Sequence, residues 1–237
     1  MSTHDARRTW PHQADQGADG PEGPFASVVI PARHEDENVR AVAQRVCKTL
    51  TRFTTRFEII FVCDGYADRT CAAVGELHTL DRRIKLLHLS RSFGHQNALL
   101  AGLDHASGRV VITMDGDLQH PPETIADLLG KWEQGYDVVH AIRRSAGSAI
   151  GRLTGRSRGL AYSVLRRLCE VDIVPQSADF KLYDRSAVSA MRRLREQGRF
   201  NRGLASWIGF RHAAVYYDEG PRMTGRAEFR SPAGCCC

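Results

Sequence analysis

The chain has 237 residues, of which 42% are hydrophobic, and its formal net charge at pH 7 is +6. This composition is that of an ordinary globular protein with one large core, and the basic excess suits a polyanionic partner or an anionic membrane surface without choosing between them. The scattered single cysteines favour inert thiols in a reducing compartment over a disulfide framework. No apolar run approaches the roughly twenty residues of a transmembrane helix, so none is predicted.

The chain begins with a polar segment and becomes regular from Phe25 onward. Residues 1–24 are rich in His, Asp, Gly and Pro and lack the apolar stretch of a secretory signal, so we expect a disordered leader there. After it, apolar runs of strand length alternate with segments of helical spacing. The predicted strands are 26–30, 57–63, 84–89, 110–114 and 136–142, and the predicted helices are 37–53, 67–79, 94–106 and one that opens at 121–123.

This alternation predicts the α/β class, with a mostly parallel central sheet flanked by helices on both faces and joined by right-handed crossovers. Pro31 is expected to stop the first strand, because proline cannot donate to a sheet ladder. Beyond residue 142 the pattern predicts no clear order of elements.

Asp115-Gly116-Asp117 directly follows the predicted strand 110–114. A parallel strand that ends in this way presents both carboxylates at the carboxyl edge of the sheet, where ligands of open α/β sheets bind. Hard oxygen donors suit Mg²⁺ or Mn²⁺, and an ion held by one or two carboxylates keeps positions for the phosphates of a substrate. The alternative is a polar turn after a strand, and these three residues alone favour neither.

Six segments of the chain resemble, in order and spacing, those of the family-two glycosyltransferases with the GT-A-type Rossmann-like fold. Within that family, the segments are most similar to those of the polyprenyl-phosphate (dolichol-phosphate) sugar transferases. The segments are VVIPARHEDENV, EIIFVCDGYADRT, LSRSFGHQNALLAGLDHASG, VVITMDGDLQHPPE, ADFKLYDR and FNRGLASWIGF. The resemblance implies a catalytic domain at 25–229, and after it we expect a flexible Cys-rich tail at 230–237. It also implies an inverting, metal-dependent transfer of a sugar from a nucleotide-diphosphate donor to a polyprenyl phosphate.

The resemblance assigns roles to individual residues. It directs Pro31 and Glu35 toward the nucleotide and makes Asp64 the acceptor of a hydrogen bond from the base. Asp115 and Asp117 would hold the metal that bridges the donor's diphosphate, so Asp115 belongs to the donor site as well. For Glu35 the alternative is a first-turn carboxylate that the helix dipole favours.

Three further residues complete the expected site. Asp179 matches the family position of the catalytic base. Because an acceptor phosphate is already ionised near neutral pH, we expect Asp179 to orient it more than deprotonate it; the alternative is a carboxylate that caps a strand entrance. Arg202 and Arg222 are candidates for clamping phosphate, since guanidinium groups bind phosphate oxygens bidentately, with ordinary surface arginines as the alternative.

Between Ala141 and Cys169 the chain carries seven arginines and no acidic residue, interleaved with apolar side chains. Such a basic amphipathic segment suits an anionic bilayer, where a polyprenyl phosphate resides. We therefore expect a cytoplasmic protein that is peripheral on the inner face of the membrane. The alternative is a solvated basic helix packed on the domain, and no recognition motif points to nucleic acid.

Several positions depart from the family pattern, namely Arg33-His34, Cys63, Tyr66-Ala67 and the loop Gly225-Arg226-Ala227-Glu228. The first three crowd the expected base site, and the last brings a carboxylate to the expected phosphate loop. Two other hypotheses follow, a soluble glycosyltransferase that acts on a small molecule and a non-catalytic nucleotide-binding module. The sequence assigns no sugar, no nucleotide base, no oligomeric state and no role to Cys235-Cys236-Cys237.

Overall fold

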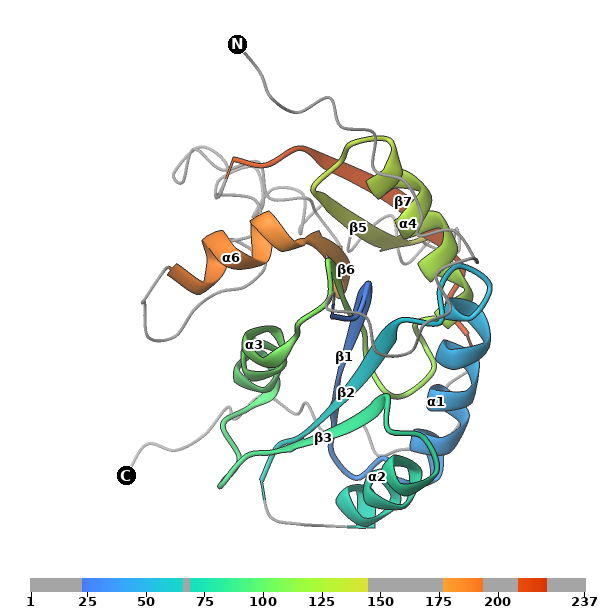
Figure 1. The fold of residues 1–237 in the computed structure, drawn as a ribbon, viewed down its shortest axis with the longest axis vertical. Coiled ribbons are helices and arrows are strands. Elements are labelled where there is room, and N and C mark those ends of the chain that lie inside the picture. Colours follow the sequence, from blue (N-terminus) through green and yellow to red (C-terminus); the bar gives the residue numbers. More distant parts are fainter. Residues whose placement is uncertain (1–22, 66–68, 145–176, 194–208, 221–237) are drawn as a thin grey trace, which may run out of the picture.

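The computed structural model describes residues 23–65, 69–144, 177–193 and 209–220, which form one sheet with helices on both sides (Figure 1). Its strands are β1 (Ala26–Ala32), β2 (Phe57–Cys63), β3 (Ile84–His88), β4 (Val110–Thr113), β5 (Val138–Arg143), β6 (Ser177–Asp184) and β7 (His212–Tyr217). Its helices are α1 (Asp36–Leu50), α2 (Arg69–Leu80), α3 (His95–His105), the short 3₁₀ helix η1 (Pro122–Thr124), α4 (Ile125–Glu133) and α6 (Arg185–Arg193).

The strands lie in the order β3-β2-β1-β4-β6-β5-β7. In the described sheet β6 runs antiparallel to both of its neighbours, β4 and β5, and the other strand pairs are parallel. The predicted α/β class with a mostly parallel sheet is therefore confirmed. Because β6 runs the opposite way, its first residues lie at the edge of the sheet where β1, β2 and β4 end.

The two faces of the sheet are covered by different helices. Successive strand residues point to opposite faces, so β1 gives Val28 and Ile30 to one core and Val29 to the other. Apolar side chains of α1, α2 and α4 close the first core, and those of α3 and α6 close the second (Figure 1). Burial on both faces explains why these strands appear in the sequence as continuous apolar runs.

The prediction that Pro31 stops the first strand is wrong, because β1 continues to Ala32. The pairing of β1 with β4 ends at Val29 and Thr113. Val29 directs its carbonyl to Met114 on the β4 side, and Pro31, two residues later, faces the same side. Since β4 has no strand residue left to pair there, the N–H that proline lacks has no ladder bond to make.

The limits of the expected domain fall mostly outside the described residues. Apart from Gly23 and Pro24, the predicted leader lies outside them, as does the predicted tail at 230–237. The basic segment is described only as far as Arg144. In the part of the chain that the structure describes, no helix combines the length and the apolar character that crossing a bilayer requires.

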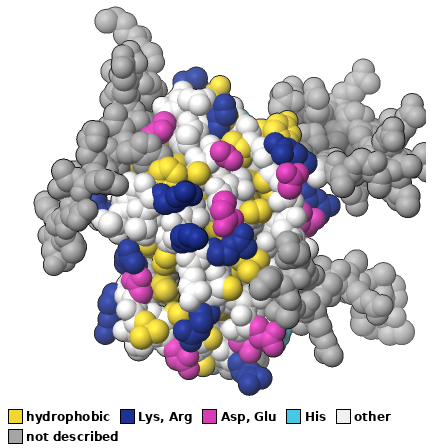
Figure 2. Space-filling view, turned by 90° about the vertical axis from the view of Figure 1, so that its right-hand side faces the viewer, with side chains coloured by type: hydrophobic (Ala, Val, Ile, Leu, Met, Phe, Trp, Pro, Cys, Tyr) yellow, Lys and Arg dark blue, Asp and Glu magenta, His cyan; other side chains and the backbone are white. Residues whose placement is uncertain are grey.

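The face that carries α1 and α2 has side chains of both charges. Figure 2 shows Lys and Arg side chains interspersed with Asp and Glu over this side of the molecule. Some of these opposite charges form ion pairs, such as Arg45 with Glu123, whose charged atoms lie 2.7 Å apart, and Arg83 with Asp81 at 2.8 Å. The net positive charge of the chain is therefore not gathered into one basic patch on the described part of this face.

Candidate active site

Carboxylates from several elements gather at the carboxyl edge of the sheet. Asp64 directly follows β2, and Asp115 comes two residues after the end of β4. Asp179 belongs to β6, where the pairing of Thr113 with Lys181 brings it to the same edge. The hydroxyl of Thr113 donates to the backbone oxygen of Asp179 over 2.6 Å, which holds the two strands together at this point. The fold thus brings residues 64, 115 and 179 to one edge.

The loop Asp115-Gly116-Asp117 has the character of a cation site. Oδ1 of Asp115 is buried and accepts no hydrogen bond from the described residues. Oδ1 of Asp117 accepts one from the backbone nitrogen of Gln119 at 3.0 Å, and Leu118 adopts a left-handed conformation with φ 64°. Nε2 of His95 lies 3.5 Å from Oδ1 of Asp115, which is long for a hydrogen bond, so this oxygen keeps acceptor capacity and the loop fits a divalent metal ion.

The loop offers a metal ion two carboxylates, those of Asp115 and Asp117. Among the described residues, no group of three or more His, Cys, Asp and Glu side chains surrounds a common metal position. Two carboxylates and the phosphate oxygens of a substrate are the usual ligands of a magnesium or manganese ion in nucleotide-dependent enzymes. The donor set of this loop fits that arrangement.

His120 contacts the backbone of the carboxylate loop, and this role was not predicted from the sequence. The backbone nitrogen of Asp115 donates to Nδ1 of His120 over 3.0 Å. The imidazole is buried, stacks on Phe180 with ring centroids 5.1 Å apart and meets the edge of Tyr217 at 5.8 Å. The available signal was a histidine five residues after the first aspartate, in a turn that the carboxylates already marked.

Asp179, in β6, packs against the first residues of α3 and is buried, with a relative exposure of 7%. Nε2 of Gln96 donates to its Oδ2 over 2.8 Å. Nε2 of His95 lies 3.2 Å from the same oxygen and 3.5 Å from Oδ1 of Asp115. The first two residues of α3 therefore link the carboxylate of β6 with the loop after β4.

Asp64 holds the loop that precedes α3. Its Oδ2 accepts from the hydroxyl of Ser92 and the nitrogen of Gly94, both at 2.9 Å, and its Oδ1 accepts from the nitrogen of Phe93 at 2.6 Å. The two bonds to Oδ2 use both of its lone pairs, whereas Oδ1 accepts one of these bonds and keeps a lone pair for a ligand. The predicted hydrogen bond to a nucleotide base remains a prediction.

Glu35 and Pro31 lie beside the carboxylate loop. A methyl group built on Gly116 would lie 3.6 Å from the backbone oxygen of Pro31 and 4.0 Å from Cγ of Glu35. The carboxylate of Glu35 accepts a hydrogen bond from the side chain of Asn38, in the first turn of α1. This contact supports the alternative role of Glu35 as a carboxylate that stabilises the first turn of the helix. The position of Glu35 beside the carboxylate loop also suits a role in the donor site.

Arg202 and Arg222 lie outside the described residues. The described part of the chain nearest to Arg222 ends at Gly220, whose backbone nitrogen donates to the oxygen of Gln119 over 3.2 Å. A methyl group on Gly220 would come within 2.6 Å of the oxygen of Leu118. The described residues after β7 therefore end against Leu118 and Gln119, directly after the carboxylate loop.

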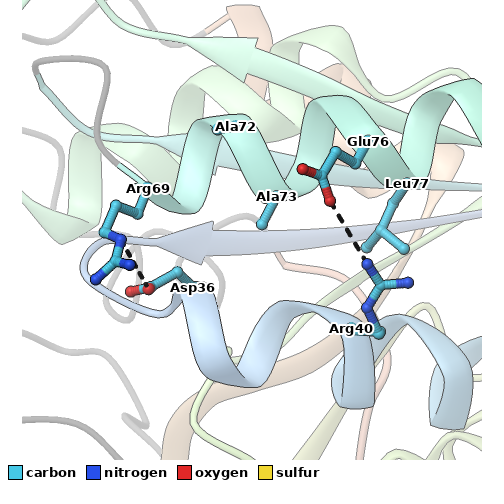
Figure 3. A pocket seen from close by; sticks show the side chains of 7 residues that line it. All are labelled: Asp36, Arg40, Arg69, Ala72, Ala73, Glu76 and Leu77. Carbon is cyan, nitrogen blue, oxygen red and sulfur yellow. Dashed lines mark ion pairs between the residues drawn. The ribbon is translucent and has the colours of Figure 1, made fainter.

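A separate hollow of about 360 Å³ lies between α1 and α2 (Figure 3). Its charged side chains form two ion pairs, Arg40 with Glu76 at 3.6 Å and Arg69 with Asp36 at 3.9 Å. None of the gathered carboxylates lines it. We therefore assign the candidate site to the carboxyl edge of the sheet and not to this hollow.

The fold and the site together define an α/β domain with acidic residues at the carboxyl edge of its sheet. The sequence pattern of the family "Glycosyl transferase family 2" matches residues 27–192, and the chain belongs to that family. The family that the sequence segments resemble is thereby confirmed.

Curated relatives agree with this family. An uncharacterized glycosyltransferase of Synechocystis sp. is 40% identical over 205 residues, which are 86% of this chain and 64% of that protein. The bactoprenol glucosyl transferase of Shigella phage SfV is 34% identical over 203 residues, 86% of this chain and 66% of that protein. The chain thus spans slightly less than two thirds of the length of these relatives.

Solved structures share the fold. Glucosyl-3-phosphoglycerate synthase of Mycobacterium tuberculosis, solved with Mn²⁺, UDP and glucosyl-3-phosphoglycerate, has a TM-score of 0.54 at 20% identity over 86% of this chain and 74% of its own. The mannosyltransferase PcManGT of Pyrobaculum calidifontis, solved with GDP-Man and Mn²⁺, has a TM-score of 0.57 at 17% identity over 93% and 62%. At these identities the likeness establishes the GT-A-type fold.

Proposed function

We propose that this chain is the catalytic domain, at residues 25–229, of a metal-dependent, inverting glycosyltransferase that moves a sugar from a nucleotide-diphosphate donor to a polyprenyl phosphate. The observation that carries the proposal is the buried Oδ1 atom of Asp115, which accepts no hydrogen bond from the described residues. It belongs to a half-buried carboxylate that is linked through His95 to the buried carboxylate of Asp179 at the carboxyl edge of the sheet. The relative from Shigella phage, named for its action on bactoprenol, supports the acceptor.

The donor site would be built from residues at three strand ends. Pro31, Glu35 and Asp64 would face the nucleotide, and Asp115 and Asp117 would hold Mg²⁺ or Mn²⁺. When bound, that ion would stabilise the charge that develops on the departing diphosphate. The Mn²⁺ complexes of PcManGT and of the mycobacterial synthase support the choice of a divalent ion. We further propose that Arg202 and Arg222 clamp phosphate oxygens, as guanidinium groups do.

Asp179 would orient the attacking oxygen. An oxygen of the acceptor phosphate forms the new bond to the anomeric carbon, and the bond from that carbon to the nucleotide diphosphate breaks, with the electron pair leaving on the diphosphate oxygen. Attack from the face opposite the leaving group inverts the anomeric centre. The carboxylate of Asp179 is buried, so a positioned acceptor would meet it in surroundings with little competing water.

Titration calorimetry tests the donor site. UDP-, GDP-, CDP- and dTDP-sugars are titrated with and without Mn²⁺ into the wild type, Asp117→Ala and Asp127→Ala. Asp127 is an exposed carboxylate on α4, so its variant is the matched control. We expect binding that needs Mn²⁺ in the wild type and the control and that is lost in Asp117→Ala. Unchanged affinity in Asp117→Ala would remove the metal site from the proposal.

A transfer assay tests the acceptor. The wild type and Asp179→Asn are incubated with the nucleotide sugar that binds in the calorimetry. The acceptor is either a polyprenyl phosphate in detergent or a soluble phosphorylated acid. We expect transfer to the lipid and, for Asp179→Asn, retained donor binding without transfer. Transfer to the soluble acid alone would favour the alternative of a small-molecule acceptor. Flotation with anionic liposomes tests the proposed cytoplasmic, peripheral membrane location separately.

A further inference from the structure

The start of α3 contacts the carboxylate proposed to orient the acceptor. Gln96 is the second residue of α3, and its Nε2 lies 2.8 Å from Oδ2 of Asp179, which is 83 residues away in the sequence. A carboxylate accepts and does not donate, so the amide nitrogen is the group that faces it. His95 lies 3.2 Å from the same oxygen. Both side chains therefore act on one oxygen of Asp179.

The helix start is held rigidly from the other side of the site. Gly94, the residue before α3, has φ 88°, and no side chain within the helix caps its end. The carboxylate of Asp64 instead accepts from the backbone nitrogens of Phe93 and Gly94. The residues directly before α3 are thus tied to Asp64, at the end of β2.

The fold does not need the bond between Gln96 and Asp179 to keep α3 in place. Ala98, Leu99 and Leu103 bury this helix in the core that it shares with β1 and β2. Gly102 brings its backbone so close to Val29 that an added methyl group would overlap that side chain. A bond to a carboxylate at the ligand-binding edge therefore calls for a role beyond anchoring the helix.

We infer that Gln96 is a positioning residue, which fixes the rotamer of the Asp179 carboxylate so that its other oxygen is directed to the acceptor. This inference rests on the proposed function, in which Asp179 orients the attacking phosphate. Without the amide, the carboxylate keeps its place in β6 but loses one of the two side chains, Gln96 and His95, that contact its Oδ2. Gln96 then affects the transfer step and not the binding of the donor.

Three variants test this inference. Gln96→Leu removes the amide that donates the hydrogen bond and keeps a side chain of similar size, and Gln96→Glu replaces the amide with a second carboxylate. Gln44→Leu, the control, makes the same chemical change at an exposed position of α1. We expect kcat to fall by about 10- to 100-fold in Gln96→Leu, as for other partners that orient active-site ligands. The fall is larger in Gln96→Glu because two carboxylates repel each other. Donor affinity with Mn²⁺ stays within about twofold of the wild type, and Gln44→Leu retains kcat.

A wild-type kcat in Gln96→Leu would overturn the inference, as would a parallel loss of kcat and donor affinity. A second measurement does not depend on turnover. The shifts in Tm of Gln96→Leu and Asp179→Ala are compared with that of the double variant, and we expect them not to add, because each change removes the same bond. Additive shifts would contradict the contact. If the wild type itself neither binds nor transfers a sugar, the proposed function fails, and the Tm comparison still judges the contact.

Discussion

The backbone nitrogen of Asp115 donates a hydrogen bond to Nδ1 of His120, with 3.0 Å between the two atoms. To accept this bond Nδ1 must carry no proton, so Nε2 holds the proton of the neutral ring. The imidazole is in turn packed between Phe180 of β6 and Tyr217 of β7. His120 thereby fastens the carboxylate loop to the half of the sheet that follows β4.

His120→Phe should separate the packing of this ring from its hydrogen bond. Phenylalanine keeps an aromatic ring beside Phe180 but leaves the N–H of Asp115 without its acceptor. We expect the free energy of unfolding to fall by about 1–3 kcal/mol and Mn²⁺-dependent donor affinity to weaken by about tenfold. Chemical denaturation and titration calorimetry measure the two effects. Wild-type affinity in this variant would show that His120 does not shape the carboxylate loop.

Gly102→Ala should destabilise the protein through a single methyl group. A Cβ at this position would lie 2.2 Å from Cγ1 of Val29 and 3.0 Å from Cγ2 of Val62. Overpacking of this kind costs about 1–3 kcal/mol of the free energy of unfolding. Gly75→Ala is the matched control, because its Cβ would point into open space on α2. That control should stabilise the protein by about 0.5–1 kcal/mol, the helix penalty of glycine.

A second change tests whether Val29 causes the clash at Gly102. Val29→Ala removes the methyl group that an alanine at position 102 would meet. The double variant should therefore be more stable than the sum of the two single effects predicts. Simple additivity in chemical denaturation would show that α3 moves away from β1 and does not press on this side chain.

Much of the fold was predictable because its signals are local. Apolar runs and helical spacing gave the elements up to β5, and the sequence placed Asp64 and Asp115 after strands, as the structure does. The family segments also directed attention to Asp179. Their gathering at one edge follows from the geometry of parallel strands, which needs no knowledge of side-chain contacts.

The features that the sequence did not reveal depend on contacts between distant residues. Nothing near Ser177 indicates that β6 inserts antiparallel between β4 and β5. The bond from Gln96 to Asp179 likewise exists only once that insertion is made. Pro31 was misjudged because its effect on β1 depends on where β4 ends, which is a property of the neighbouring strand and not of the residue.

Glu58 should stabilise the edge of the sheet opposite the site. Its buried carboxylate accepts from the hydroxyl of Ser27 at 2.5 Å, from Lys85 at 2.6 Å and from the nitrogen of Ser107 at 2.8 Å. Glu58→Gln should lower the free energy of unfolding at pH 7 by about 1.5–3 kcal/mol, the range for hydrogen bonds to a charged group. Glu76→Gln, at an exposed ion pair with Arg40, is the control and should cost less than about 1 kcal/mol.

The contribution of Glu58 should vanish in acid. Burial by itself raises the pKa of this carboxyl, but the hydrogen bonds from Lys85, Ser27 and Ser107 outweigh it and leave the pKa below its ordinary value of 4.5. A carboxyl with a depressed pKa stabilises the fold above its unfolded pKa, and this stability is lost as the pH falls through the folded value. The difference between wild type and Glu58→Gln, followed by urea denaturation, should therefore shrink below about pH 4.5. A difference that is constant down to pH 3 would contradict this assignment.

His140 should make the protein less stable in mild acid, at a pH where Glu58 does not yet titrate. It is almost fully buried, and its Nε2 lies 3.0 Å from Nδ1 of His212. Burial, with smaller effects of the charges of Lys181 and His212, lowers the pKa of His140 from 6.5 to about 3. Below about pH 6.5 this histidine is therefore protonated in the unfolded chain but stays neutral in the folded protein. The free energy of unfolding keeps its full value above this pH and falls progressively toward pH 3.

Between pH 7 and pH 5 this difference in proton uptake should cost about 2 kcal/mol, at about 1.4 kcal/mol per pH unit below the unfolded pKa. His140→Gln has no such proton to take up, so its free energy of unfolding should vary less over this interval. His105→Gln, at an exposed position of α3, should keep the wild-type dependence. Urea denaturation at pH 7, 6 and 5 makes the comparison. An equal loss of stability in His140→Gln and the wild type would mean that the buried histidine is protonated in the folded protein or that other groups govern this range.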